Sequence, residues 1–260
     1  MQKKHQEWHE QWSLFQDDEL FLFRDWIYPN TLEDFKNKEV LECGCGGGQH
    51  TFFIAPYARS ITAVDLNTID IAMERNKKFD NVRFVEADIA TMDLNRKFDI
   101  VFSIGVVHHT DNPDRAVENL KRHVKPGGKL ILWVYSKEGN LLVRCLVEPI
   151  RKIFLKHIIS NKKLLTLCKI ITALLYIPFY SIYMLHLRFL PYYEYSENFR
   201  KLSFYRNNLN VFDKLNAPQV DFISKDRIER WFDESEFENI HIRFYKGVSW
   251  SGSGTKKCQK

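Results

Sequence analysis

Short apolar runs alternate with amphipathic stretches over the first half of the chain. The apolar runs predict strands around Val40 and Leu41 and over residues 60–65, 82–89, 98–105 and 130–135. The stretches between them predict helices over 49–55, 67–77 and 112–123, and a turn over 124–129. Because buried strands alternate with helices, the pattern predicts a parallel sheet that is covered by helices on both faces.

The end of the chain carries a different pattern. Residues 224–234 predict a helix with Ile228, Trp231 and Phe232 on one face. Residues 239–244 alternate between apolar and polar, as a half-buried strand does, and 247–250 are placed to return as its hairpin partner. A helix followed by a hairpin is therefore expected after residue 223.

The stretch VLECGCGGGQHT joins the first strand to the first helix. A strand, a glycine turn and a helix start form the opening of a nucleotide-binding βαβ unit. Glycine is needed there because a side chain would collide with a ligand lying against the backbone. The dinucleotide fingerprint G-x-G-x-x-G fails, since its sixth position counted from Gly44 is Gln49. The pattern that fits is E-x-G-x-G-x-G, formed by Glu42, Gly44, Gly46 and Gly48.

The acid in this pattern bears on the choice of ligand. NAD carries a pyrophosphate, whereas S-adenosylmethionine carries a sulfonium cation and no phosphate, so an acid at the strand end suits the second ligand better. Asp65 ends the second strand, 21 residues after Gly44, where nucleotide-binding units of this kind place the acid that binds the ribose hydroxyls. Asp88 ends the third strand and is placed to meet an adenine amino group.

With these motifs in one order, the chain resembles the class I S-adenosylmethionine-dependent methyltransferases, in the branch that includes many small-molecule methyltransferases. The resemblance rests on ECGCGGG (42–48), AVDL (63–66), VEADI (85–89), FDIVFSIGVVHHT (98–110) and LKRHVKPGGKLILWVY (120–135). It implies a Rossmann-like α/β sheet of seven strands, mostly parallel with strand seven antiparallel. It also implies that S-adenosylmethionine is the methyl donor and S-adenosylhomocysteine the product.

The resemblance further implies a set of donor-binding residues. Glu42, Gly44, Gly46 and Gly48 would hold the methionine end, Asp65 the ribose hydroxyls, and Asp88 with Ile89 the adenine. Further expected donor contacts are Cys45, Leu66 and Ile104.

Composition sets the bounds of this interpretation. A chain of 260 residues with 45% apolar residues can hold one substantial α/β domain and an elaboration. The five cysteines form no C-x-x-C pair, so we expect no bound metal, no disulfide framework and a reducing, cytoplasmic location. The first residues, MQKKHQEWHEQW, lack the apolar run of a signal peptide.

Residues 1–38, which precede the first strand, are rich in aromatic side chains. One interpretation is a helical lid that closes over the donor or acceptor, with Trp12 on the acceptor side. The other is a helix that packs its rings on the domain surface. The sequence leaves both open.

Two histidines follow the fourth strand, on the edge where ligands bind in open α/β sheets. His108 or His109 could serve as a general base for O- or C-methylation, because histidine titrates near the working pH. Alternatively, one packs against the lid and the other is solvated. Amide and base N-methyltransferases of this fold carry an Asn/Asp-Pro-Pro-aromatic tetrad here, and its absence argues against adenine or glutamine N-methylation. A base is not obligatory, because positioning alone can carry much of the rate of methyl transfer from a sulfonium.

The insertion over 136–223 carries the positive charge of the chain. It holds 13 Lys and Arg against 6 Asp and Glu, whereas the whole chain has a net charge of +5. Ile150, Ile153, Phe154 and Ile158 predict the apolar face of a basic amphipathic helix, and the 18 residues from Ile170 to Leu187 carry no formal charge. That run is interpreted as a transmembrane helix, as a surface-lying element that meets anionic lipid or a lipid-linked acceptor, or as helices that cap the active site.

We expect four parts: a lid over 1–38, the donor-binding core over 39–135, a basic helical cap over 136–223, and 224–260 completing the core. Tyr192, Tyr193 and Asp213 are acceptor-side candidates in the cap, since tyrosines offer ring faces and hydroxyls together. The expected function is O-methylation of a small or lipid- or glycan-linked acceptor, with peripheral membrane contact through 144–190 as one possibility. No nucleic-acid-binding module is recognisable, so nucleic acid is not an expected partner.

Two functions of other classes stay open. A non-catalytic membrane-surface or binding module could retain the fold, and liposome flotation without methyl transfer would support it. A nucleotide-dependent oxidoreductase is disfavoured by the failed dinucleotide fingerprint, and nicotinamide binding that outcompetes S-adenosylmethionine would revive it.

Overall fold

A computed structural model describes residues 19–151, 161–217 and 219–258. The chain divides into two compact units. The described residues of the first unit are 19–136, 219–245 and 249–258, and those of the second are 137–151, 161–217 and 246–248. Each unit is described by itself.

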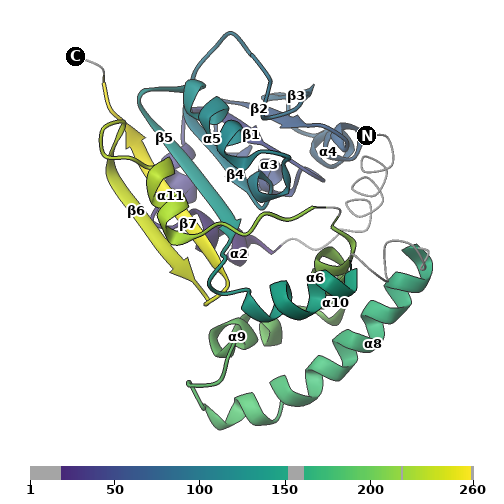
Figure 1. The fold of residues 1–260 in the computed structure, drawn as a ribbon. Helices are drawn as coiled ribbons and strands as arrows, with labels where there is room; N and C mark the ends of the chain where they lie inside the picture. Colours follow the sequence, from purple (N-terminus) through teal and green to yellow (C-terminus); the bar gives the residue numbers. More distant parts are fainter. Residues whose placement is uncertain (1–18, 152–160, 218, 259–260) are drawn as a thin grey trace. The chain divides into compact units, whose positions relative to one another are not determined.

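The first unit is built on one seven-stranded sheet with the order β3-β2-β1-β4-β5-β7-β6 (Figure 1). Its strands are β1 (Glu39–Cys43), β2 (Ser60–Asp65), β3 (Val82–Glu86), β4 (Phe98–Ile104), β5 (Val124–Tyr135), β6 (Phe237–Tyr245) and β7 (Ser249–Lys256). The first five strands are parallel to one another, and β7 lies antiparallel to both β5 and β6. The predicted fold class, including the antiparallel strand seven, is confirmed.

Side chains on the sheet alternate between two apolar cores, as period-two strands require. On β5, Leu132 and Val134 belong to the core on one face, while Ile131 and Trp133 belong to the core on the other. The first core is closed by α5 (Pro113–Arg122) and α11 (Lys225–Trp231), and the second by α2 (Leu20–Ile27), α3 (Gln49–Ile54) and α4 (Ile69–Asn76). The sheet is thus covered on both faces, as the alternation of strands and helices predicts.

Two strands differ in extent from the sequence-based prediction. The third strand ends at Glu86 rather than Ile89, because Asp88 closes a short turn in which its carboxylate accepts the N–H of Ala90. Residues 124–129 are not a separate turn but the start of β5. The register against β4 jumps there from Phe98–Val124 to Ile100–Lys129, so the extra residues of β5 loop out. Pro126 and Gly127 suit such a bulge, since Gly127 has a φ of +74°.

The hairpin β6–β7 depends on two glycines of β7 that face Phe232. A Cβ on Gly252 would lie 2.4 Å from a ring carbon of Phe232, and one on Gly254 would lie 3.0 Å from the ring. Gly252→Ala is expected to lower the free energy of unfolding by about 2 kcal/mol through overpacking, and Gly254→Ala by less. Urea unfolding of both variants checks this, and equal losses would contradict the steric explanation.

The second unit is helical. Its elements are a π-helical turn over Val143–Val147, α6 (Glu148–Ile150), α8 (Asn161–Phe179), a 3₁₀ turn over Ile182–Leu185, α9 (Tyr193–Lys201) and α10 (Phe204–Asn216). A small apolar core joins α8 to α10 through Leu164, Cys168 and Phe212. Most of the predicted amphipathic helix with Ile153, Phe154 and Ile158 lies outside the described residues.

The described part of the predicted lid begins at Glu19. It forms α2 and a 3₁₀ turn over Leu32–Phe35. Phe23, Ile27 and Phe35 are buried in the core of the first unit, so this part of the segment packs on the domain. The lid over the site stays a prediction. Trp12 lies outside the described residues.

Candidate functional site

The glycine turn follows the carboxyl end of β1 and has a backbone that favours glycine. Gly44, Gly46 and Gly48 have φ values of +83°, +51° and +74°. The N–H groups of Gly44 and Cys45 donate to the carbonyl of Val64 at the end of β2, over 2.7 and 2.9 Å. The turn is therefore tied to the neighbouring strand at its first residues.

Two of these glycines are also required by close packing. A Cβ on Gly44 would lie 2.4 Å from the methyl groups of Val106, in the loop after β4. A Cβ on Gly48 would lie 2.5 Å from Nδ2 of Asn76, which donates to the Gly48 carbonyl over 2.9 Å. The loop that carries His108 and His109 thus lies directly against the glycine turn.

Asp65 links the end of β2 to the same turn. One carboxylate oxygen accepts the N–H of Gly46 and the other accepts the N–H of Asn67, each over 2.9 Å. Thr68, just beyond, donates to the Gly46 carbonyl over 2.7 Å. These bonds hold the carboxylate at the carboxyl edge of the sheet and leave lone pairs on each oxygen for a ligand's hydroxyls.

Glu42 is a carboxyl group buried beneath the turn, with 1% of its surface exposed. Burial raises its pKa to about 8, against a hydrogen bond from Thr51 that lowers it. Its Oε1 has no hydrogen-bond partner among the described residues, and Nδ1 of His50 lies 3.7 Å away. A buried acid with an unsatisfied oxygen is a group that a bound cation would stabilise in its charged form.

The other predicted donor-binding residues divide into two groups. Leu66 is exposed beside Asp65, and Asp88 is exposed in the turn after β3, so both side chains are accessible at the carboxyl edge. Cys45, Ile89 and Ile104 are buried, and the side chains of Cys45 and Ile104 pack in the core that α2 and α3 cover. Cys45 and Ile104 can therefore meet a ligand mainly through their backbone.

His108 and His109 lie in a 3₁₀ turn, Val107–His109, directly after β4. His108 is fully buried against the rings of His109 and Tyr135, and neither ring nitrogen has a hydrogen-bond partner in the described part of the chain. Burial, and to a lesser degree the neighbouring His109, lowers the pKa of His108 well below its ordinary value. His108 is therefore neutral at physiological pH.

His109 is held differently. Its Nδ1 lies 2.8 Å from the carbonyl oxygen of Gln219, and a carbonyl can only accept, so Nδ1 carries the proton that it donates. In the neutral ring this tautomer leaves the lone pair on Nε2. The Gln219 side chain in turn donates to the carbonyl of Thr110 over 3.0 Å. Of the two histidines, His109 is the one whose tautomer a hydrogen bond fixes.

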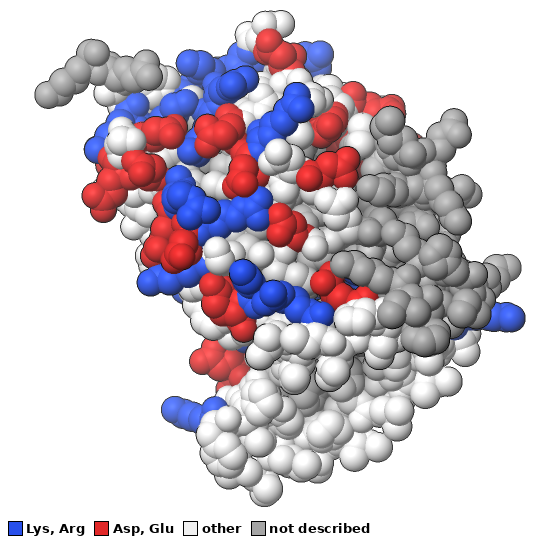
Figure 2. All heavy atoms as spheres, viewed as in Figure 1, with Lys and Arg blue, Asp and Glu red and all other residues white. Residues whose placement is uncertain are grey.

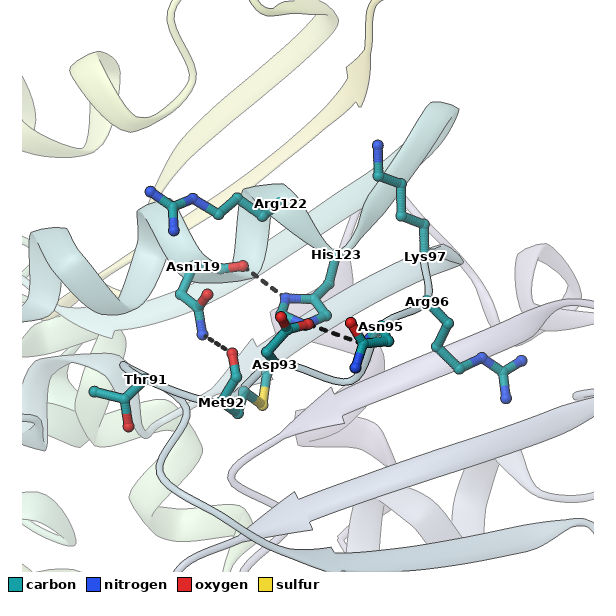
Figure 3. Close-up of a pocket in the computed structure, with 9 residues that line it drawn as sticks. All are labelled: Thr91, Met92, Asp93, Asn95, Arg96, Lys97, Asn119, Arg122 and His123. Atoms are coloured by element: carbon teal, nitrogen blue, oxygen red, sulfur yellow. Dashed lines mark hydrogen bonds between the residues drawn. The ribbon is translucent and has the colours of Figure 1, made fainter.

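A hollow in the described structure lies elsewhere. It has a volume of about 560 Å³ (Figure 3). Its lining residues precede β4 and β5, and they are Thr91, Met92, Asp93, Asn95, Arg96, Lys97, Asn119, Arg122 and His123. It therefore lies at the amino ends of the strands, opposite the glycine turn. Figure 3 shows that Arg96, Lys97 and Arg122 point away from one another, and Asn119 donates to the Met92 carbonyl over 2.8 Å. Because its cationic groups do not converge, we do not assign a site there.

The acceptor-side candidates lie in the second unit, apart from Trp12, which the structure does not describe. Tyr193 begins α9 and is buried, whereas Tyr192 is half-buried with a φ of +60°. Burial raises the pKa of Tyr192, against a backbone hydrogen bond from Leu142. Asp213 is half-buried on α10 and interacts electrostatically with Arg151. Their role as acceptor contacts remains a prediction.

Several residues that support the site were not found by sequence reasoning. Thr51 binds Glu42, Thr68 and Asn76 bind turn carbonyls, Val106 packs on Gly44, and Gln219 orients His109. Thr51 lies nine residues after Glu42, inside the motif, which could have suggested it, whereas Thr68 lies 22 residues after Gly46 and outside the motif. Gln219 lies 110 residues after His109, and no sequence signal connects the two.

The residues at the carboxyl edge fit S-adenosylmethionine. The ammonium of its methionine end matches the unsatisfied oxygen of buried Glu42, and its ribose hydroxyls match Asp65. Exposed Leu66 offers an apolar surface next to Asp65. No group of three or more His, Cys, Asp or Glu within the described ranges could hold a metal ion, and the five cysteines are unpaired.

Comparison with known proteins gives the same fold. Residues 41–132 match a family model described as a methyltransferase domain. The ubiquinone biosynthesis O-methyltransferase of Coxiella burnetii is 35% identical over 107 residues, which is 39% of this chain and 45% of that enzyme. The structure of an O-methyltransferase family protein from Burkholderia thailandensis has a TM-score of 0.55 at 13% identity, covering 92% of this chain and 57% of that one. The CurJ carbon methyltransferase has a TM-score of 0.50 at 11% identity, covering 86% of this chain and 50% of that one.

These matches are partial in length. The chain spans less than half of the ubiquinone-pathway relative, and the family model matches only the core from β1 to β5. The second unit lies outside the family match.

Proposed function

We propose that this chain, which carries a class I S-adenosylmethionine-dependent methyltransferase domain, transfers the methyl group of S-adenosylmethionine to an oxygen of a small or lipid- or glycan-linked acceptor. The observation that carries the proposal is the acid-and-glycine turn after β1, tied to the ribose-binding acid of β2 by the bond from Gly46 to Asp65. Bound S-adenosylmethionine supplies a methyl group on a positively charged sulfur, which leaves as the neutral thioether of S-adenosylhomocysteine.

The residues of the chain bind and orient this donor. Glu42 attracts the cationic methionine end, Asp65 holds the ribose hydroxyls, and Asp88 with Leu66 meets the adenosine at the accessible edge. The loop from Gly105 to His109 lies against the turn, so an acceptor at that loop would be next to the methyl group. Positioning of this kind supplies a large share of the rate of a displacement reaction.

His109 acts as the general base in this proposal. Its Nδ1–H donates to the carbonyl of Gln219, so Nε2 carries the lone pair that can accept the proton of an acceptor hydroxyl as its oxygen attacks the methyl carbon. His108 is fully buried and neutral, and we assign it to the wall of the site beside Tyr135. The oxygen specificity rests on this base and on the absence of the N-methyltransferase tetrad.

The second unit supports the choice of acceptor class. It is basic and helical, it lies outside the family match, and it carries Tyr192, Tyr193 and Asp213. We assign acceptor recognition to this unit, since the donor-binding residues all lie in the first. An acidic or lipid-linked hydroxyl compound fits its charge.

Labelled methyl groups provide the test. Purified protein is incubated with radiolabelled S-adenosylmethionine and with separated lipid, glycan and small-molecule extracts of the cells that make it. The proposal expects label in one fraction, on an oxygen, and at least about fivefold less of it with the Asp65→Ala variant when the donor is kept below the wild-type Kd. Label on nitrogen or carbon would overturn the oxygen assignment, and no label in any fraction would overturn the acceptor class.

His109→Gln is expected to lower the rate of methyl transfer by about 10²-fold or more while the affinity for the donor stays unchanged, because the base is lost and positioning is kept. The pH–rate profile should lose its acidic limb in this variant. His108→Asn serves as the comparison, and we expect its profile to keep that limb. A His109→Gln enzyme with an unaltered profile would show that no base acts at this position.

A further inference from the structure

Helix α8 presents an apolar face to solvent. One side of it packs in the second unit, where Leu164 and Cys168 are buried against Phe212 of α10. On the opposite side Ile170, Leu174 and Ile177 are 55%, 59% and 66% exposed. A helix on the surface of a globular protein ordinarily places polar residues on that side, so this face has the character of a binding surface.

The apolar surface continues beyond the helix. The segment after α8 exposes Ile182, Met184, Leu185 and Phe189, and Phe189 is 81% exposed. We call these residues, together with Ile170, Leu174 and Ile177, the α8 face. In Figure 2 the surface over the second half of α8 is white, without the red of carboxylates.

The charged residues of the chain segment that carries the α8 face all have one sign. Residues 149–193 contain seven Lys and Arg and no Asp or Glu. Lys163 and Lys169 are exposed on the first half of α8, and Arg188 is exposed beside Phe189. A second copy of the chain would bring two such basic faces together, whereas an anionic lipid surface complements both the apolar side chains and the cations.

The packing of α8 favours a position in the plane of the membrane. Residues 163–185 are long and apolar enough to cross a bilayer by length and composition alone. However, α8 packs along α10, which carries Arg206, Asp213 and Lys214, and moving this pair into hydrocarbon would bury those charges. Pro178 also lies inside the helix. Only the α8 face can enter the lipid without moving charged groups of α10.

We propose that the α8 face binds the surface of an anionic lipid bilayer, with the helix in the membrane plane, the apolar side chains among the lipid chains and Lys163, Lys169 and Arg188 at the phosphate groups. The proposal is independent of methyl transfer, since lipid binding needs neither donor nor acceptor. It would bring the chain to acceptors that are themselves in the membrane.

Vesicle co-sedimentation of the full chain tests the proposal. The probes are vesicles of phosphatidylcholine alone and vesicles with about a third of phosphatidylglycerol, at low and high salt. We expect binding to the anionic vesicles that weakens with salt, and much weaker binding to the neutral ones.

Ile177→Glu should weaken binding to the anionic vesicles about tenfold, because an apolar contact with the lipid is lost and a negative charge that the lipid repels is added. Lys163→Glu with Lys169→Glu should weaken it at least about tenfold.

Met73→Glu on α4 is the matched control. Met73 is an apolar side chain of the first unit that is 52% exposed, and its replacement by Glu changes the net charge by the same amount as Ile177→Glu does. It should bind vesicles like the wild type. Equal binding by Ile177→Glu and Met73→Glu would overturn the proposal. So would a stable dimer in light scattering that Ile177→Glu dissociates without any vesicle binding, because the partner would then be a second copy. Resistance of the membrane-bound protein to alkaline carbonate extraction would also overturn it, in favour of a span.

Discussion

Glu42→Gln is expected to make the unliganded protein more stable than the wild type at pH 8, with a difference that vanishes near pH 4. The pKa of Glu42 in the folded protein is about 8, raised by burial from 4.5, so the folded state holds this proton more tightly than the unfolded chain. The bound proton therefore contributes to the free energy of unfolding. This contribution is complete below pH 4.5 and is lost progressively as the pH rises from 4.5 through 8. The wild type should therefore lose roughly 1 kcal/mol per pH unit within this window relative to the glutamine variant, which has no proton to lose.

Chemical unfolding of both proteins from pH 4 to 8 measures this difference. Glu39→Gln on the same strand is the control with the opposite sign. Hydrogen bonds from Lys125 and Arg59 lower the pKa of Glu39, so its contribution is present above the unfolded pKa and is lost only as pH falls through the lower folded value. If Glu42→Gln followed the wild type across the whole range, Glu42 would not be a neutral acid in the folded protein.

The same residue links donor binding to pH. A cationic ligand beside Glu42 lowers its pKa, so binding should release a proton and grow stronger between pH 6 and 8. Calorimetry in two buffers of different ionisation enthalpy detects the released proton. The release should disappear in Glu42→Gln and persist in His50→Gln, the variant of the other titratable group close to Glu42.

Asp65→Ala should weaken binding of S-adenosylmethionine by about 1–3 kcal/mol, or roughly 5- to 150-fold. The variant loses the carboxylate for the ribose hydroxyls and leaves the N–H groups of Gly46 and Asn67 without their acceptor. The affinity for S-adenosylhomocysteine should fall by the same factor as the affinity for the donor, since both ligands contain the ribose.

Asp93→Ala supplies a matched control for this variant. Asp93 also accepts a backbone N–H two residues later, that of Asn95 over 2.9 Å, but it lies at the opposite edge of the sheet. Its donor affinity should equal that of the wild type. Equal weakening in both variants would point to a general loss of stability rather than to a ribose-binding role for Asp65.

Much of the core could be predicted because its elements carry local signals. The alternation of apolar runs with helical stretches predicted five parallel strands. The glycines after Leu41 predicted the turn, since glycine adopts the positive φ of Gly44, Gly46 and Gly48 without strain. Boundaries were less accurate where a side chain ended an element locally, as Asp88 does for β3, or where a bulge kept a glycine-rich segment within a strand, as in β5.

What could not be predicted depends on contacts between distant parts of the chain. The orientation of His109 comes from Gln219, and the burial of His108 comes from Tyr135 on β5, which sequence spacing does not reveal. The raised pKa of Glu42 likewise follows from complete burial beneath the turn. The motif identified these residues as candidates, whereas their protonation states required the packed structure.

Titration calorimetry of the wild-type protein with S-adenosylmethionine and S-adenosylhomocysteine tests the central claim most directly. We predict micromolar binding of both ligands, one per chain, and no comparable binding of NAD. Absence of binding to either ligand, from a protein shown by its unfolding transition to be folded, would contradict the assignment of the glycine turn as a methyl-donor site.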